Sequence, residues 1–545
     1  MLKASRHTVP LVALLCAACS PLRAPVDRSP TELRVPLVRD VQSLDPVGDA
    51  DITSANVVRQ LYEGLIEYDP RTLRPVPRLA RSWRVSDGGR QWTFELQAGV
   101  RFVDDPCFPG GRGREATASD FKYSLERGLR PGRGGGDGAP PSPIAGLEEF
   151  RRGRAEHIAG ITAPSPGELV IRLERPDPRL LHLLAQPSCW LVAREAAEAY
   201  GEGLRRHPVG TGPFRLISWE PLSGILLARH LGYWQADASG VRLPYVDALR
   251  FVPYWRDDPN RLFAEGRLDM VFSYVLGPDS AGAGEWDAPG SAGAPQRFFV
   301  SRLNTIYVRF DYRSRHPAMR DRRLRQALGF ALPRPVGTAH IAARGLLPPG
   351  LPGYDPALAG QRTDAAEARR LLDEAGYPGG GRLPPLRIAW REWDAGVGNQ
   401  FANTLRGLGL RVELTLYNDP EYWPAVDGRR ADLFREGWVA DYPDPENFFQ
   451  LFAAGSSAGG HAAGYPNAEY QRLFDALRAE VDSTTRVTLA RRLERILVED
   501  AGALFLQHER ETQFVSARVE GWEGNCTNPL HLCQYERVRV RPVNR

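Results

Sequence analysis

The sequence predicts an α/β fold built from short strands and amphipathic helices, with no single long run of parallel strands. The clearest indication is a β-α-β pattern, in which the strand-like runs Leu386–Trp390 and Val412–Tyr417 flank the helical segment Asn399–Gly407. Such alternation favours parallel pairing of the two strands. A second indication is the segment Ala365–Ala375, whose leucines share one face and which Gly376 ends, as expected of a helix.

The other predicted elements follow from the spacing of apolar residues. Alternation of apolar and polar residues predicts strands, and spacing by three or four predicts helices. Arg130–Pro143 is rich in Gly and Pro and predicts a surface loop. The predicted strands are Leu33–Val38, Trp92–Leu96, Leu169–Leu173 and the parts of Gly212–His230 on either side of Trp219, and the predicted helices are Ile52–Leu65, Ala118–Leu129 (capped by Thr117 or Ser119), Tyr470–Glu480 and Ser483–Asp500.

Size and composition narrow the classes of protein. A chain of 545 residues predicts two or more domains. With 42% hydrophobic and 25% charged residues, it is neither disordered nor a multi-span membrane protein. The formal net charge of +4 comes from 70 basic and 66 acidic side chains, and this balance argues against a nucleic-acid partner.

The N-terminus has the pattern of an export signal. Lys3 and Arg6 precede the apolar run Val9–Ala18, which is too short to span a bilayer as a mature helix. Cys19 follows, and Ala17-Ala18-Cys19 looks like the end of a lipobox, although Cys16 stands where such a motif usually has Leu. We therefore expect a signal peptide over residues 1–18, lipidation of Cys19 and a tether over 19–32. A plain cleaved signal peptide is the alternative.

Four cysteines besides Cys19 would remain in an exported protein. They are Cys107, Cys189, Cys526 and Cys533. An even number in such a chain suggests disulfides, and four cysteines allow three pairings between which the sequence does not choose. Metal binding is the rival interpretation, which the lack of CxxC spacing disfavours.

Signatures of catalysis are missing from the sequence. There is no GxSxG, HExxH or GxxxxGK[ST] motif, and the ten histidines are scattered. Asp441 and Asp444 could be imagined as paired carboxylates, but Pro443 and Pro445 favour a rigid extended loop. We therefore expect neither an enzyme nor a cofactor.

An ordered series of motifs resembles family 5 of the bacterial extracellular solute-binding proteins, which includes the oligopeptide- and dipeptide-binding components of ABC importers. The series spans nearly the whole chain after the N-terminal signal, and this order makes the resemblance specific. The segment Val103–Arg114 departs from it, being longer than the short turn that the family usually has there. The motifs are Ser43–Pro46, Tyr62–Leu65, Pro77–Trp83, Trp92–Phe94, Gly99–Phe102, Thr117–Phe121, Pro208–Phe214, Tyr233-Trp234, Leu243–Asp247, Gly266–Asp269, Arg325–Leu328, Gly353–Pro356, Leu371–Pro378 and Gly437–Phe449.

The resemblance implies a two-lobed periplasmic-binding-protein fold (class II-like, cluster C), with an extra domain beside lobe one. Lobes of this kind close on a ligand that lies between them. Carried onto this sequence, the resemblance implies lobe one at 33–61, 201–285 and 509–545, the additional domain at 62–200, and lobe two at 286–508.

The resemblance also implies ligand-binding residues within and just before Gly437–Phe449. Asp441 would pair with the α-ammonium group of a peptide, and Arg435 would meet a peptide carboxylate. The backbone of Gly437 and Val439 could pair with an extended peptide, and Trp438 could wall a side-chain pocket. The alternatives are a loop-capping Asp441, an ion pair of Arg435 with Glu436 or Asp432, and a core position for Trp438.

These implications predict the substrate-binding protein of an ABC transporter, which captures short peptides and delivers them to a membrane permease. It would act in the periplasm or cell envelope, as a monomer held to the membrane by its N-terminal lipid. Capture of a metal chelate, haem, an opine or an oligosaccharide by the same fold is the first alternative. A secreted hydrolase, or a sensor or chaperone without a transporter, are alternatives of other classes.

Overall fold

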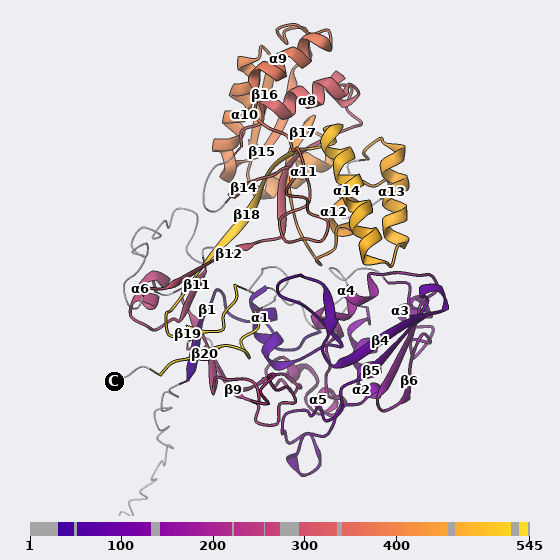
Figure 1. Cartoon of the computed structure of the whole chain (residues 1–545), viewed down its shortest axis with the longest axis vertical. Coiled ribbons are helices and arrows are strands. Elements are labelled where there is room, and N and C mark those ends of the chain that lie inside the picture. The colour runs from indigo at the N-terminus through magenta and orange to yellow at the C-terminus, as the bar shows by residue number, and fades with distance from the viewer. Residues whose placement is uncertain are drawn as a thin grey trace, which may run out of the picture.

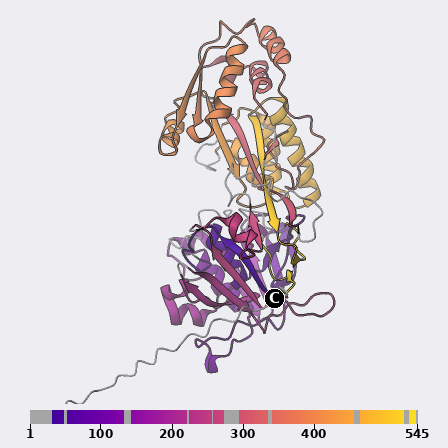
Figure 2. The same ribbon diagram turned by 90° about the vertical axis from the view of Figure 1, so that its left-hand side faces the viewer.

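The protein has two parts stacked along its long axis, joined by strands on one side (Figures 1 and 2). The computed structural model describes residues 31–47, 52–131, 142–220, 223–255, 257–272, 294–334, 340–455, 464–524 and 533–542. The expected signal peptide, Cys19, most of the tether and Cys526 lie outside these residues. No helix of the described residues is long and apolar enough to cross a membrane.

The lower part in Figure 1 contains two four-stranded sheets. In the first, β1 pairs in parallel with β10, so the first described strand meets a segment more than two hundred residues later. The second is antiparallel, and helix α2 contacts two of its strands, β6 and β7. The first sheet has the order β1 (Glu32–Leu37), β10 (Ala248–Pro253), β9 (Gly224–Arg229), β8 (Phe214–Glu220), and the second β4 (Ala80–Ser86), β5 (Gln91–Leu96), β7 (Glu168–Arg172), β6 (Ile161–Ser165).

The upper part contains most of an eight-stranded sheet, whose longest strand, β18, runs down into the lower part (Figure 1, yellow). The first residues of β18 pair with β13, and its last residues pair with β12 and β11. The strands of this sheet are β11 (Met270–Phe272), β12 (Gln296–Ser301), β13 (Asn304–Phe310), β14 (His340–Ala342), β15 (Leu386–Arg391), β16 (Val412–Tyr417), β17 (Leu433–Val439) and β18 (Leu504–Val515).

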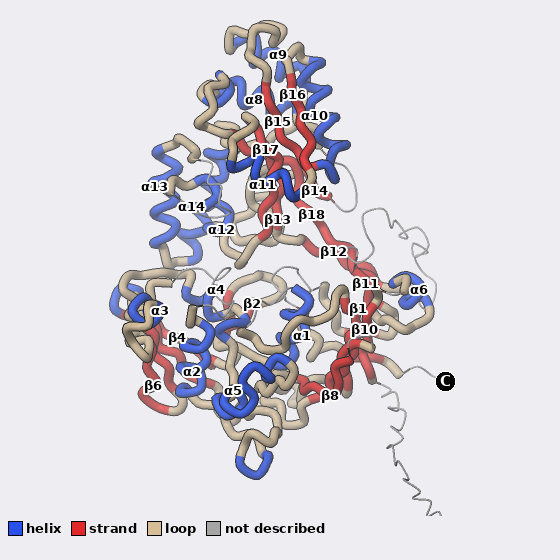
Figure 3. The backbone as a smooth tube through the Cα atoms, turned by 180° about the vertical axis from the view of Figure 1, so that it is seen from behind, coloured by secondary structure: helices blue, strands red, loops and turns tan. Residues whose placement is uncertain are grey.

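Helices surround both parts (Figure 3). Short pairs of strands complete the described secondary structure: β2 (Ile66–Tyr68) with β3 (Pro75–Pro77), and β19 (Val519–Glu520) with β20 (Arg539–Val540). The helices are α1 (Ile52–Leu61), α2 (Ala118–Gly128), α3 (Leu147–Arg151), α4 (Leu180–Leu184), α5 (Arg194–Tyr200), α6 (Pro259–Ala264), α8 (Arg322–Ala331), α9 (Ala365–Glu374), α10 (Ala395–Gly407), α11 (Asp419–Asp427), α12 (Glu446–Phe449), α13 (Ala468–Ala479) and α14 (Ser483–Glu499).

The predicted elements are present, and their bounds differ by a few residues. The parallel pairing predicted for Leu386–Trp390 and Val412–Tyr417 is confirmed between β15 and β16. The first helix ends at Leu61 and not at residue 65, and the helix predicted over Asn399–Gly407 begins four residues earlier, at Ala395. A Cβ atom on Gly64 would lie 2.6 Å from the ring of Trp190, so the close packing there leaves no room for a side chain.

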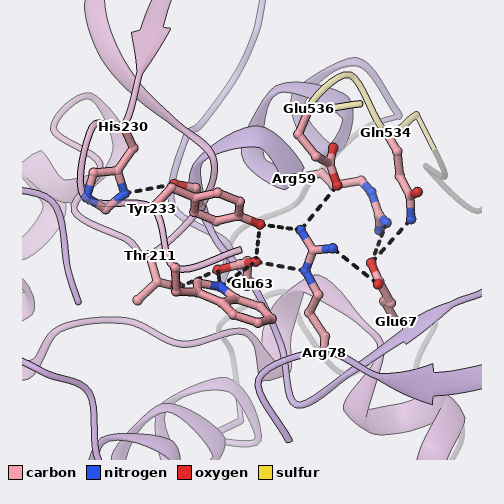
Figure 4. Close-up of polar contacts among 11 residues, drawn as sticks. Arg59, Glu63, Glu67, Arg78, Thr211, His230, Tyr233, Gln534 and Glu536 are labelled. Carbon is pink, nitrogen blue, oxygen red and sulfur yellow. Dashed lines mark hydrogen bonds and ion pairs between the residues drawn. The ribbon is translucent and has the colours of Figure 1, made fainter. Parts of the chain in front are cut away.

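Residues of three sequence motifs, Glu63, Arg78 and Tyr233, meet in a buried polar cluster (Figure 4). Arg78 donates from Nε to Glu63 at 2.8 Å and from Nη1 to Glu67 at 3.2 Å. Its Nη2 reaches Glu536, near the C-terminus, and the hydroxyl of Tyr233. The guanidinium therefore ties four separate segments of the lower part together, which gives Glu63 and Arg78 a structural role.

Disulfides were expected at four cysteines, and two of these cysteines are free thiols. Cys107 and Cys189 are free thiols, whereas Cys533 is disulfide-bonded. Cys189 is buried where a short helical turn packs against α2, and the backbone N–H of Cys107 donates to Asp105. Burial raises the pKa of each thiol to about 12. The disulfide prediction is therefore wrong for Cys107 and Cys189.

Candidate functional site

Strand β17 has one open edge beside the segment Gly437–Phe449. It pairs along its whole length with β13, from Leu433 opposite Phe310 to Val439 opposite Asn304. On its other side, β15 pairs only with Leu433 and Phe434. The strand is buried up to Glu436, but Gly437 is exposed and Val439 is 44% exposed. The last residues of the strand that leads to Asp441 therefore face solvent.

Two hydrogen bonds show which backbone groups point to the open edge. The N–H of Ala440 donates to Leu303, next to β13, at 3.0 Å. The carbonyl of Arg435 instead accepts a hydrogen bond from the Tyr422 hydroxyl, away from β13. Because backbone groups along a strand alternate between its two edges, those of Gly437 and Val439 point to the open edge with Arg435. These groups can accept an added strand.

Arg435 is buried and already has a partner. Its Nε donates to Asp394 at 3.1 Å, and its guanidinium carbon lies 4.5 Å from the ring centroid of Trp393. Burial lowers the pKa of Arg435, and the charge of Asp394 partly opposes this. Arg435 therefore forms an ion pair, as the alternative predicted, but its partner is Asp394 and not Glu436 or Asp432. Glu436 points to the opposite face of the strand and pairs with Arg309, and Asp432 pairs with Arg387.

Gly437 lets the neighbouring side chains lie close along the strand. A Cβ atom there would come within 2.8 Å of Ile306 Cδ1, and within 3.8 Å of Arg435 Nη1. The guanidinium of Arg435 therefore reaches along the strand to the level of Gly437.

Asn447 holds Asp441 and Trp438 together, and sequence reasoning did not single it out. Its Nδ2 donates to Asp441 Oδ2 at 3.0 Å. Its Oδ1 accepts from the Asp441 backbone N–H at 3.1 Å and from Trp438 Nε1 at 2.8 Å. Asn447 is fully buried in α12. Its place in Gly437–Phe449 was the only signal that could have indicated it. Trp438 is half-buried and not fully in the core, and its place in a side-chain pocket stays a prediction.

Asp441 carries a carboxylate with no cationic partner among the described residues. The side chain is open to solvent on one side. The protein atoms packed around the rest of it hinder its hydration and raise the pKa of Asp441, an effect that the hydrogen bond from Asn447 partly offsets. A carboxylate in this state gains stability from a cation that binds beside it.

The loop after Asp441 is fixed by buried ion pairs, and this excludes a catalytic pair of Asp441 and Asp444. Asp444 binds Arg486 of α14 at 2.5 Å, and it lies 3.5 Å from His182 of α4. Burial alone would raise the pKa of Asp444, but Arg486 and His182 hold this pKa well below its usual range. Tyr442 is buried, and its hydroxyl donates to Glu446 at 2.6 Å.

The same loop contacts the lower part of the protein. Glu446 lies 3.6 Å from Arg179, and the side chain of Gln186 donates to the backbone carbonyl of Asp441 at 3.5 Å. The ring of His182 is stacked with that of Tyr68 and tilted against that of Tyr442. Asp441 therefore lies where the two parts meet. The described residues contain no group of His, Cys, Asp and Glu side chains that could hold a metal ion.

The fold and this site define a solute-binding protein, and comparison with known proteins supports that class. The model for "Bacterial extracellular solute-binding proteins, family 5 Middle" matches residues 74–460. The chain therefore belongs to this family, as the motifs predicted. Its members are solute-binding proteins and not enzymes, which confirms that prediction as well.

Individual relatives agree in sequence and in fold. A dipeptide-binding protein of Escherichia coli (strain K12) is 26% identical, over 88% of this chain and 89% of its own. A glutathione-binding protein, GsiB, of Escherichia coli O1:K1 is 28% identical, over 80% and 79%. The unliganded open form of the murein tripeptide-binding protein MppA has a TM-score of 0.78 at 22% identity, over 93% of this chain and 97% of its own. The predicted periplasmic-binding-protein fold is thus confirmed.

Proposed function

We propose that the protein captures short peptides with a free α-ammonium group in the cell envelope and delivers them to an ABC permease. The observation that carries this proposal is the Asp441 carboxylate, which lies at the end of the open edge of β17 and pairs with no cation of the described part of the chain. An ammonium group there would form charge-assisted hydrogen bonds to the carboxylate.

The open edge supplies the second half of recognition. A peptide that adds to β17 would exchange hydrogen bonds with Gly437 and Val439, whose backbone groups point to that edge. Backbone pairing of this kind gives affinity for any extended peptide, so the ammonium contact fixes its register and direction. The relative named as a dipeptide-binding protein supports this ligand class.

Arg435 is the proposed partner of the peptide carboxylate, with fewer of its nitrogens available than in an unpaired arginine. Its Nε is engaged by Asp394, so only its terminal nitrogens remain for a ligand. We therefore assign it a smaller share of the affinity than Asp441.

The division into lobe one (33–61, 201–285 and 509–545), an additional domain (62–200) and lobe two (286–508) is part of the proposal. The separate sheets of the lower part and the passage of β18 between the two parts support it. Closure of the lobes would cover the open edge of β17 and exclude water from the ammonium contact.

Glutathione, or a ligand like it, is a second candidate. It also has a free α-ammonium group, and the relative GsiB is named as glutathione-binding. Its γ-glutamyl link would not present a regular strand to β17, so it would depend on Asp441 more than on the open edge.

Calorimetric titration of the mature protein with matched peptides tests the proposal. Ala-Ala-Ala should bind, and N-acetyl-Ala-Ala-Ala should bind at least tenfold more weakly, because acetylation removes the ammonium charge. Asp441→Asn should weaken the binding of Ala-Ala-Ala and leave the binding of N-acetyl-Ala-Ala-Ala unchanged. Equal binding of the two peptides would refute the role of Asp441, and binding of glutathione but of no peptide would favour the second candidate.

Lipid attachment at Cys19 and partnership with a permease are also proposed. Mass spectrometry of protein from its native host should show a diacylated N-terminus at Cys19, and Cys19→Ser should move the protein from the membrane fraction to the soluble fraction. An unmodified N-terminus at another residue would instead show a plain cleaved signal peptide.

A further inference from the structure

Trp393 is a large aromatic residue that is exposed and yet held in place. It lies in the short turn Glu392–Asp394 after β15, and its side chain is 62% exposed. Its Nε1 donates to Asp419 at 3.2 Å, and the guanidinium of Arg435 stacks on its ring at 4.5 Å. One face of the ring is therefore occupied, while much of its surface faces solvent.

A second exposed tryptophan is attached to the same anchor. Trp423, in α11, is 42% exposed, and the guanidinium carbon of Arg391 lies 5.1 Å from its ring centroid. Arg391 also binds Asp419, the residue that holds Trp393, at 2.5 Å. The two tryptophans thus belong to one cluster of aromatic rings and guanidinium groups that is fixed by Asp419.

This cluster lies at one end of the open edge of β17. Strand β15 stops pairing with β17 after Phe434 and then turns into the segment that carries Trp393. The guanidinium of Arg435, which stacks on Trp393, reaches the level of Gly437, and Asp441 lies four residues farther along the chain, at the other end of the edge. At about 3.3 Å per residue this is roughly 13 Å, the length of three or four residues of an extended peptide.

The two arginines of this cluster are already paired with carboxylates. Asp394 neutralises Arg435, and Asp419 neutralises Arg391. A ligand charge would therefore meet arginines that already have carboxylate partners, whereas a flat apolar group would find an exposed ring. Offset stacking and edge-to-face contacts between aromatic rings favour such a ligand group beyond the area that they bury.

We infer that Trp393 determines specificity, as a stacking platform for an aromatic side chain at the third or fourth residue of the bound peptide. This inference rests on the proposed function, because it places the peptide ammonium at Asp441. It adds a side-chain preference to a site whose other contacts are to backbone and termini.

Titration with tri- and tetrapeptides tests the inference. Ala-Ala-Phe and Ala-Ala-Ala-Phe are compared with the all-alanine peptides of equal length, and Phe-Ala-Ala serves as the positional control. With the unmodified protein, at least one of the two peptides that end in Phe should bind about five- to tenfold more tightly than its all-alanine counterpart.

The variants separate the platform from the rest of the site. Trp393→Ala should abolish the preference for Phe and leave the affinity for Ala-Ala-Ala within about twofold, and Trp393→Phe should retain most of the preference. The matched control is Trp255→Ala, which removes an exposed tryptophan of the lower part and should change neither value.

The outcomes distinguish this inference from the function on which it rests. If Phe and alanine peptides bind equally, or if Trp393→Ala keeps the preference, peptide capture stands and the platform is refuted. If Phe-Ala-Ala gains as much affinity as the peptides that end in Phe, the assigned position is refuted. If no peptide binds the unmodified protein, the proposed function fails and the platform fails with it.

Discussion

Asn447 and Asp441 form a reciprocal pair, in which the side-chain amide of Asn447 donates to the Asp441 carboxylate and accepts from the Asp441 backbone N–H, at 3.0 and 3.1 Å. The same amide oxygen accepts from Trp438 at 2.8 Å. One buried residue therefore sets the direction of the carboxylate on which the proposed ligand contact depends.

Asn447→Ala should weaken both the fold and ligand binding. The change leaves the Trp438 indole N–H and the Asp441 N–H without an acceptor, and we expect a loss of about 1–3 kcal/mol in the free energy of unfolding. Urea denaturation measures this loss, and calorimetry with Ala-Ala-Ala measures the affinity. Asn403→Ala, at an exposed position of α10, should change neither. Unchanged affinity in Asn447→Ala would show that Asp441 needs no positioning.

Binding of a free-amine peptide should weaken in acid at a higher pH than an ordinary aspartate would cause. The pKa of Asp441 is raised, so protonation of its carboxylate begins above the usual range and removes the charge that holds the ammonium. Titrations of Ala-Ala-Ala from pH 7.5 to pH 4 should show this loss, whereas Asp441→Asn should show a much flatter profile. The same pH dependence in both proteins would assign it to another group.

Arg486→Gln should strongly destabilise the protein. It breaks a buried pair and leaves the Asp444 carboxylate without its closest cation, which costs about 3–5 kcal/mol. Thermal and urea unfolding measure the change. Arg194→Gln removes a solvent-exposed ion pair with Glu198 and is the control, for which no measurable change is expected. A similarly small effect in both variants would mean that the loop after Asp441 does not depend on this anchor.

Gly437→Val should reduce peptide affinity more than stability. The new side chain would meet the flexible end of Ile306 and the guanidinium of Arg435, and it would crowd the open edge of β17. We expect at least a tenfold loss of affinity for Ala-Ala-Ala. Gly407→Ala, where a Cβ atom has open space, is the control and should bind normally. Full affinity in Gly437→Val would place the peptide away from this edge.

Cys107 and Cys189 should resist alkylation in the native protein. Burial raises the pKa of each thiol to about 12, so the reactive thiolate is scarce at pH 8. Mass spectrometry after iodoacetamide treatment should show little labelling of either residue before denaturation and complete labelling of both after it. A disulfide-linked peptide that contains Cys107 and Cys189 would contradict the free thiols of the structure.

Much of the fold follows from local sequence patterns. The strand Val412–Tyr417 was predicted with its observed bounds, and the helix Ser483–Asp500 to within one residue, because their spacing of apolar residues is regular. Strands β13 and β18 were not predicted, since both are buried along much of their length and show no clean alternation.

The candidate site was only partly predictable for a similar reason. Asp441 lies within the motif Gly437–Phe449 and Arg435 lies two residues before it, so the motif indicated both residues. Asp394 and Trp393, which contact Arg435, come from a turn about forty residues earlier, and only the folded chain brings them together. Asn447 lies in the motif, but its role depends on the direction of one side chain, which no sequence pattern specifies.

Strand β18 has a consequence for how the chain can vary over evolution. Its twelve residues pair with strands in both parts of the protein, so one register serves two separate cores. Because neighbouring side chains in a strand face opposite sides, an insertion of a single residue in its middle would turn every later side chain to the wrong face. Length changes should therefore collect in exposed loops, while β18 keeps its length even where its amino acids diverge.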